Sequence, residues 1–120
     1  MLFGRKDADK PLKFKVKQTS DAAVVKVSGP AGIAEAEKLR RKLMKIVDKK
    51  TPLIVIDMSE MDFISSVGLG AIISAHLKCR YYGGRIRLAG PTPAVAQLLE
   101  TTRLTKLFPI YPDVARALSE

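Results

Sequence analysis

The most informative segment of this chain reads Asp57-Met58-Ser59-Glu60-Met61-Asp62-Phe63-Ile64-Ser65-Ser66-Val67-Gly68-Leu69-Gly70. It follows the apolar run Leu53-Ile54-Val55-Ile56, which is typical of a strand buried on both faces. The strand is expected to end at Asp57, and a short loop then leads to the paired serines Ser65 and Ser66. The serines open a second apolar segment, so the pattern predicts a buried strand, a loop and a buried helix at 67–81.

The paired serines at the start of that helix allow two interpretations. A serine in this position can simply cap the backbone N–H groups that the first helical turn leaves without partners. The same N–H groups and the positive end of the helix dipole would also favour a phosphate attached to a serine. A phosphate would add roughly −1.5 to −2 charges at one surface point. The segment can therefore serve as a helix cap, as a phosphorylation switch, or as both.

The residues before this segment predict a hairpin and one helix. Residues 13–17 alternate polar and apolar side chains, and 22–28 are rich in valine, so both are expected to be strands. The turn Gly29-Pro30-Ala31-Gly32 should end the second strand. A helix is expected at 33–49, because its apolar residues recur every three or four positions: Ile33, Ala36, Leu39, Leu43, Ile46 and Val47.

The residues after it predict further alternation of helices and strands. Gly83-Gly84 should stop the helix at 67–81. Strands are expected at 85–89 and 107–110, and helices at 93–101 and 112–119. Such alternation favours mostly parallel strands with right-handed crossovers. The fold class is therefore α/β: a four- or five-stranded mixed sheet with about four helices packed mainly on one side.

Composition is typical of one water-soluble domain. The chain has 120 residues, of which 47% are hydrophobic, and its apolar runs are shorter than the roughly 20 residues of a membrane span. Residues 1–12 are expected to be a flexible leader and 13–120 a single domain. The N-terminus lacks the apolar core of a signal peptide, so we expect a cytoplasmic protein without membrane insertion. Its net charge of +9 favours an acidic or anionic partner.

The segment at 57–70 resembles the signature of STAS domains, which is typically Asp-x-Ser-x-x-x-Phe-x-Asp-Ser-Ser-Gly-Leu-Gly. Matching residues are Asp57, Ser59, Phe63, Ser66, Gly68, Leu69 and Gly70. Further similarity follows in order and spacing at Gly83-Gly84, Leu88, Gly90-Pro91, Pro93-Ala94-Val95, Leu98-Leu99 and Leu104–Phe108. The resemblance covers roughly 13–119 and points to the anti-sigma factor antagonists within this family.

This resemblance implies a regulatory binding module rather than an enzyme. The serine that family members phosphorylate aligns with Ser66, and Ser65 is the second candidate. The implied partner is an anti-sigma factor that is also a serine kinase of the histidine-kinase-like ATPase type. The implied partner-binding residues are Gly29, Pro30, Ala31, Gly32, Ser65, Ser66, Val67 and Leu69.

The chain departs from the family pattern at two places. Ser65 stands where the family has an acid, and Gly29–Gly32 lacks both acids of the family's Gly-Glu-apolar-Asp segment. These differences bear on partner identity and on phosphorylation. They leave open an alternative function, a constitutive subunit of a larger assembly such as a lipid-transport ATPase complex or a signalling scaffold.

Other site chemistries receive little support from the sequence. His76 and Cys79 lie three residues apart on one expected helix, but two ligands do not make a closed zinc site. Gly68-Leu69-Gly70 lacks the third glycine of a dinucleotide fingerprint. The basic face of the first helix has few aromatic neighbours, so nucleic acid is not the expected partner. We therefore expect no catalytic residues, no metal and no cofactor.

Overall fold

The computed structural model describes residues 11–120 and shows a five-stranded sheet with helices between the strands. The elements in chain order are β1 (Lys13–Gln18), β2 (Ala22–Ala31), α2 (Ala36–Asp48), β3 (Leu53–Ile64), α3 (Ser66–Arg80), β4 (Arg85–Ala89), α4 (Pro93–Thr101), the 3-10 helix η1 (Leu104–Lys106), β5 (Ile110–Tyr111) and α5 (Val114–Ser119). The sheet order is β1-β2-β3-β4-β5, and only the β1–β2 pair is antiparallel. The expected mixed α/β fold is confirmed.

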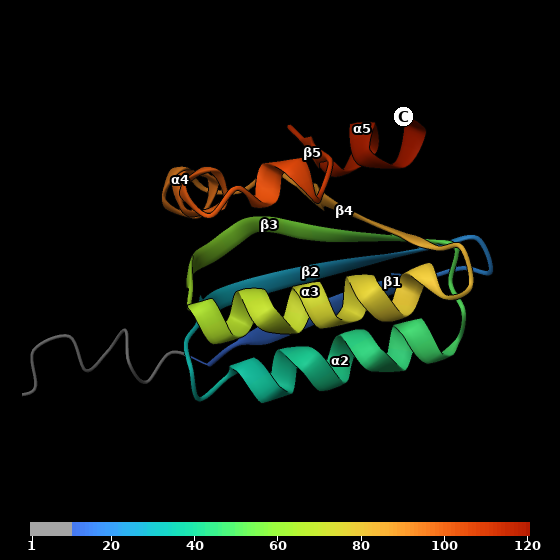
Figure 1. Ribbon diagram of the computed structural model, residues 1–120, viewed down its shortest axis with the longest axis horizontal. Helices are drawn as coiled ribbons and strands as arrows, with labels where there is room; N and C mark the ends of the chain where they lie inside the picture. The colour runs from blue at the N-terminus through green and yellow to red at the C-terminus, as the bar shows by residue number, and fades with distance from the viewer. Residues whose placement is uncertain (1–10) are drawn as a thin grey trace, which may run out of the picture.

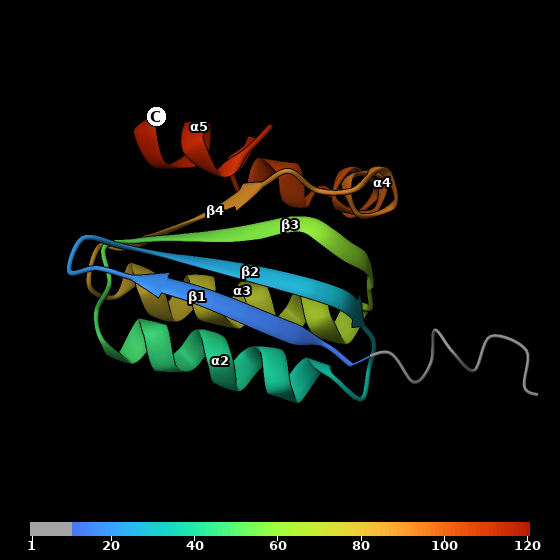
Figure 2. The same cartoon turned by 180° about the vertical axis from the view of Figure 1, so that it is seen from behind.

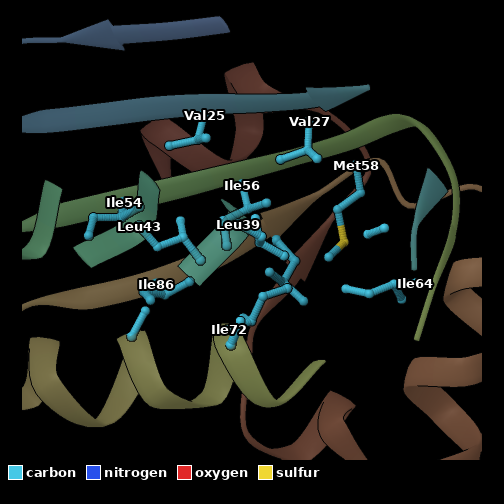
Figure 3. Close-up of a cluster of buried hydrophobic side chains, with 14 of the residues drawn as sticks. Val25, Val27, Leu39, Leu43, Ile54, Ile56, Met58, Ile64, Ile72 and Ile86 are labelled. Atoms are coloured by element: carbon cyan, nitrogen blue, oxygen red, sulfur yellow. The ribbon is translucent and has the colours of Figure 1, made fainter. Parts of the chain in front are cut away.

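Helices α2 and α3 lie side by side along one face of the sheet, and α3 starts where β3 ends (Figures 1 and 2). The short helix α5 packs on the opposite face, where Ala117 joins Val55 and Ala89 in a small apolar cluster. The larger core lies between the sheet and α2 and α3. Figure 3 shows side chains from three strands meeting Leu39 and Leu43 of α2 and Ile72 of α3 in that core.

Both central strands are longer than the sequence predicted. β2 does not end at the Gly29–Gly32 turn but continues to Ala31, and β3 does not end at Asp57 but continues to Ile64. The two extensions pair with each other, with register shifts between Lys26 and Ser28 and between Gly29 and Pro30. A bulged strand tolerates proline and glycine, which is why the usual stop signals failed here.

Three other boundaries also differ from the expectation. The first helix begins at Ala36, because Glu35 and Ala36 donate their N–H groups to Gly32 and Ile33 in a turn. The last strand is only Ile110–Tyr111, since Pro109 interrupts the apolar run and has no N–H to donate. The closing helix begins at Val114 rather than 112, where the Asp113 carboxylate accepts the Arg116 N–H at 2.8 Å.

The expected leader at 1–12 lies mostly outside the described residues. Its last residue, Leu12, is buried in the main core and therefore belongs to the folded domain. The Pro11 carbonyl lies close to Gly29, where a β-carbon would stand only 2.7 Å from the oxygen. Gly29 also has a φ of +100°, so both the backbone conformation and this close approach require glycine.

Candidate functional site

The start of α3 is held in place by Ser65, the N-cap residue. The Ser65 hydroxyl oxygen accepts the Gly68 N–H at 3.0 Å, and the Ser65 carbonyl accepts the Leu69 N–H at 2.9 Å. The Ser65 N–H in turn donates to the Ala31 carbonyl at the end of β2, at 2.8 Å. The capping interpretation of the paired serines therefore applies to Ser65, which joins the end of β2 to the beginning of α3.

Ser66 is the first residue of α3, and it is exposed. Its hydroxyl does not take part in the cap. The first turn of α3 contains no acidic residue, so the positive end of the helix dipole is not compensated there by a carboxylate from the same turn. The site can chemically accommodate a negatively charged group on Ser66 at the molecular surface.

Gly68 allows α3 to begin close to the ends of β2 and β3. A β-carbon at this position would stand 2.8 Å from Ile64 Cγ1 and 3.3 Å from the Ala31 carbonyl oxygen. A β-carbon on Gly70, two residues further along the helix, would meet nothing within 4 Å. Only the first of these two glycines is therefore required for packing.

Several residues expected to bind a partner are buried. Gly29, Pro30 and Ala31 are buried within β2. Leu69 is one of the buried residues of α3. Pro30 and Ala31 pair with Phe63 and Ile64 of β3, so this segment is part of the sheet and not an exposed loop. These four residues shape the site from beneath. Gly32, which is half-buried, and the exposed Ser66 and Val67 remain at the surface.

Exposed apolar side chains occur on all three segments that meet near the start of α3. Val67 is 49% exposed, Phe63 at the end of β3 is 48% exposed, and Ile33 in the loop before α2 is 72% exposed. Phe63 lies against Gly32, and Ile33 and Val67 line the same shallow groove between α2 and α3. We call Ile33, Phe63, Ser66 and Val67 the docking face. Exposed apolar groups gathered in this way are characteristic of protein-binding surfaces.

Sequence reasoning missed Ile33 and Phe63 as surface residues. Ile33 fits the apolar spacing of the helix expected at 33–49, and for that reason Ile33 was predicted to face the core. The strand through Phe63 was taken for a loop. A signal was nevertheless present, because an alternating continuation of β3 would have placed Phe63 on the opposite side from its buried neighbour Ile64.

His76 and Cys79 are both buried in the described structure, as core residues would be. Burial and the neighbouring Arg80 lower the pKa of His76, and burial raises the pKa of the Cys79 thiol. No group of three or more metal-binding side chains occurs among residues 11–120. No helix in the same range is long and apolar enough to cross a membrane.

The sheet order, the strand-to-helix junction at Ser65 and the exposed serine beside it define a small α/β module with exposed apolar side chains at the start of α3. The family model described as the STAS domain matches residues 13–117, and the chain belongs to this family. One curated relative is the anti-sigma F factor antagonist of Paenibacillus polymyxa. It is 24% identical over 110 residues, which are 91% of this chain and 94% of the relative.

Solved structures agree with this assignment. The crystal structure of an anti-sigma factor antagonist from Mycobacterium paratuberculosis has a TM-score of 0.83 and 29% identity, over 91% of this chain and 92% of that one. The Bacillus protein SpoIIAA has the same fold, at 19% identity and a TM-score of 0.70 in its unphosphorylated form and 18% and 0.65 in its phosphorylated form. The unphosphorylated match covers 82% of this chain and 87% of SpoIIAA, and the phosphorylated match covers 82% and 90%.

Proposed function

We propose that this chain is an anti-sigma factor antagonist that is switched by phosphorylation of Ser66. In the unphosphorylated form it binds an anti-sigma factor through the docking face, and the sigma factor is released. The anti-sigma factor is also the serine kinase, of the histidine-kinase-like ATPase type. Phosphorylation of Ser66 then ends the interaction.

The observation that carries this proposal is that only one of the two adjacent serines caps the helix. Ser65 caps α3, and the exposed Ser66 is free of that structural duty. A phosphate can therefore be added to Ser66 without removing the bond that positions the helix. Its charge would lie beside Ile33, Phe63 and Val67, which a partner must cover with apolar surface. Burying an unpaired phosphate there is costly, so modification would weaken binding.

The charge around the docking face bears on which partner fits. Neither Ser65 nor Gly32 carries the acid that the family pattern has at these positions. The neighbouring face of α2 is basic, and Arg40 and Glu37 line the groove next to Ile33 and Val67. Glu37 is paired with Arg40 at 2.7 Å, so its charge is largely compensated. The same ion pair compensates the charge of Arg40, and the Glu35 carboxylate lies close to Gly32, so this face offers a partner its apolar side chains rather than a net charge.

The same missing acids support one alternative, a constitutive subunit of a larger assembly. In that case the docking face would bind its partner permanently and Ser66 would not be modified. Recovery from the source cell of a membrane ATPase, rather than a histidine-kinase-like ATPase, would favour this second function.

The switch is tested by intact-mass measurement after incubation with the kinase partner and ATP. We expect the mass of one phosphate group to be added and peptide mapping to place it on Ser66. The Ser66→Ala variant should gain nothing, whereas Ser20→Ala, which removes an exposed serine in the turn between β1 and β2, should be modified normally. Absence of modification, or a phosphate mapped to another residue, would refute the switch.

A further inference from the structure

A second recess lies at the opposite end of α3 from Ser66. It has a volume of about 370 Å3 and is lined by His76, Arg80, Gly83, Gly84, Arg85, Ile86 and Pro109. Ser66 and Arg80 are the two ends of α3, so at 1.5 Å per residue they are about 21 Å apart. The volume falls within the range of small-ligand sites. This recess is therefore separate from the docking face and large enough to hold a ligand.

The recess exists because β5 is too short to cover β4. β5 pairs only with Leu88 and Ala89, which leaves the first half of β4 without a neighbour on that side. The Leu88 N–H donates to the Pro109 carbonyl on this edge at 3.0 Å, whereas the Arg85 N–H points the other way, to Pro52. Alternation along a strand directs the Ile86 N–H to the same open edge as that of Leu88. The wall of the recess thus offers a backbone donor.

His76 is the buried polar side chain of this recess. It is only 7% exposed, and neither of its ring nitrogens has a hydrogen-bond partner within residues 11–120. Its ring packs edge-on against Phe108 at 5.0 Å between centroids, which accounts for its packing but gives the nitrogens no partner. Each ring nitrogen has less than 1 Å2 of accessible surface, so the rest of the His76 side chain, and not a nitrogen, lines the recess and can report on what binds there.

The charge in the recess has one sign. Arg80 lies four residues after His76 and therefore on the same side of α3, and Arg85 stands on the facing rim. Neither arginine forms an ion pair in the described part of the chain, and the lining contains no acid. The carbonyl end of the α3 dipole opposes an anion, but its last carbonyls accept bonds from Tyr81, Tyr82, Gly83 and Gly84. Two full positive charges outweigh the remaining partial charge.

We propose that this recess is a binding site for a small phosphate-bearing anion. Arg80 and Arg85 supply the charge that neutralises the phosphate, and the edge of β4 supplies a backbone donor next to the buried His76. The site goes beyond the proposed antagonist function and does not depend on Ser66 or on any protein partner.

The single histidine of the chain makes the test direct, since its ring resonances in an NMR spectrum report on one place only. Sodium phosphate and glycerol 3-phosphate are titrated separately into the full chain, with sodium chloride at matched ionic strength as the third arm. We expect a saturable shift of the His76 ring resonances with at least one phosphate compound and none with chloride. Tighter binding of the ester would identify a phosphorylated metabolite, and equal binding would identify free phosphate.

Two charge-removing variants complete the experiment. Arg80→Gln should weaken phosphate binding by about tenfold, the effect of losing one charge-assisted hydrogen bond. Lys38→Gln removes the same charge from an exposed position near the other end of the molecule and should leave binding unchanged. Backbone amide spectra verify that both variants fold. Shifts that stay linear in every arm, or equal binding by the two variants, would overturn the proposal.

Discussion

The Ser65 hydroxyl oxygen accepts the Gly68 N–H at 3.0 Å, and this bond separates the roles of two adjacent serines. Ser65 caps the N-terminus of α3, and the Ser66 side chain is exposed at the surface beside it. Ser65→Ala should therefore lower the free energy of unfolding by about 1 kcal/mol through the lost cap. Ser66→Ala should change it by less than about 0.5 kcal/mol, as surface substitutions usually do. Urea denaturation measures both values, and equal losses in the two variants would contradict this division.

A negative charge on Ser66 should be tolerated by the fold. Ser66→Asp places a carboxylate at the exposed N-terminus of α3, where the helix dipole favours it. We expect the free energy of unfolding to change by no more than about 1 kcal/mol. A large drop in melting temperature for Ser66→Asp would show that this side chain is buried, and it would count against a surface switch.

The two glycines of α3 form a matched pair. Gly68→Ala forces a β-carbon against Ile64 and the Ala31 carbonyl and should cost about 1–3 kcal/mol of stability. Gly70→Ala meets nothing within 4 Å and should stabilise the helix by about 0.5–1 kcal/mol. Thermal melts of the two variants should move in opposite directions. A neutral Gly68→Ala would mean that α3 is not packed against β2 and β3 as described.

His76 should make stability depend on pH in the mildly acidic range. Burial, with a contribution from Arg80, lowers its pKa below the ordinary value of 6.5, and Arg85 adds a second cation at the same recess. The folded chain thus binds a proton less readily than the unfolded chain. The contribution of neutral His76 is complete above its ordinary pKa and is lost as the pH falls through the folded-state value.

Denaturant unfolding measured between about pH 7 and pH 5 should therefore show that the free energy of unfolding decreases as the pH is lowered. His76→Gln should remove most of this slope, whatever its effect on absolute stability. The carboxylates with lowered pKa values, Glu37 and Glu60, titrate at more acidic pH and should not obscure the result. A slope that is unchanged in His76→Gln would assign the effect to other groups.

The sequence predicted the order of the elements correctly, because apolar periodicity and Gly or Pro breaks mark each helix and strand. It failed at the ends of β2 and β3. Pro30 and the polar residues after Asp57 are ordinary stop signals, and only the pairing of the two extensions with each other keeps them extended. That pairing is a tertiary property, which local pattern does not contain. Because the end of β3 was predicted to be a loop, Phe63 was not included in the candidate site.

Within the site, the sequence identified the paired serines but could not say which of them caps the helix. Capping depends on the backbone geometry at Ser65, where φ is −80° and ψ is 167°, and either serine fits the local pattern. The exposure of Ile33 was likewise beyond prediction. It follows from the turn that delays the start of α2 to Ala36.

Binding to the anti-sigma factor kinase, measured by calorimetry, tests the central claim most directly. Four forms of the chain are compared: unmodified, phosphorylated, Ser66→Ala and Ser66→Asp. We expect the unmodified chain and Ser66→Ala to bind with similar affinity, and the phosphorylated chain and Ser66→Asp to bind at least about tenfold more weakly, as expected when a charge is placed in an apolar contact. Equal affinity of the phosphorylated and unmodified chains would contradict the claim that Ser66 switches the docking face.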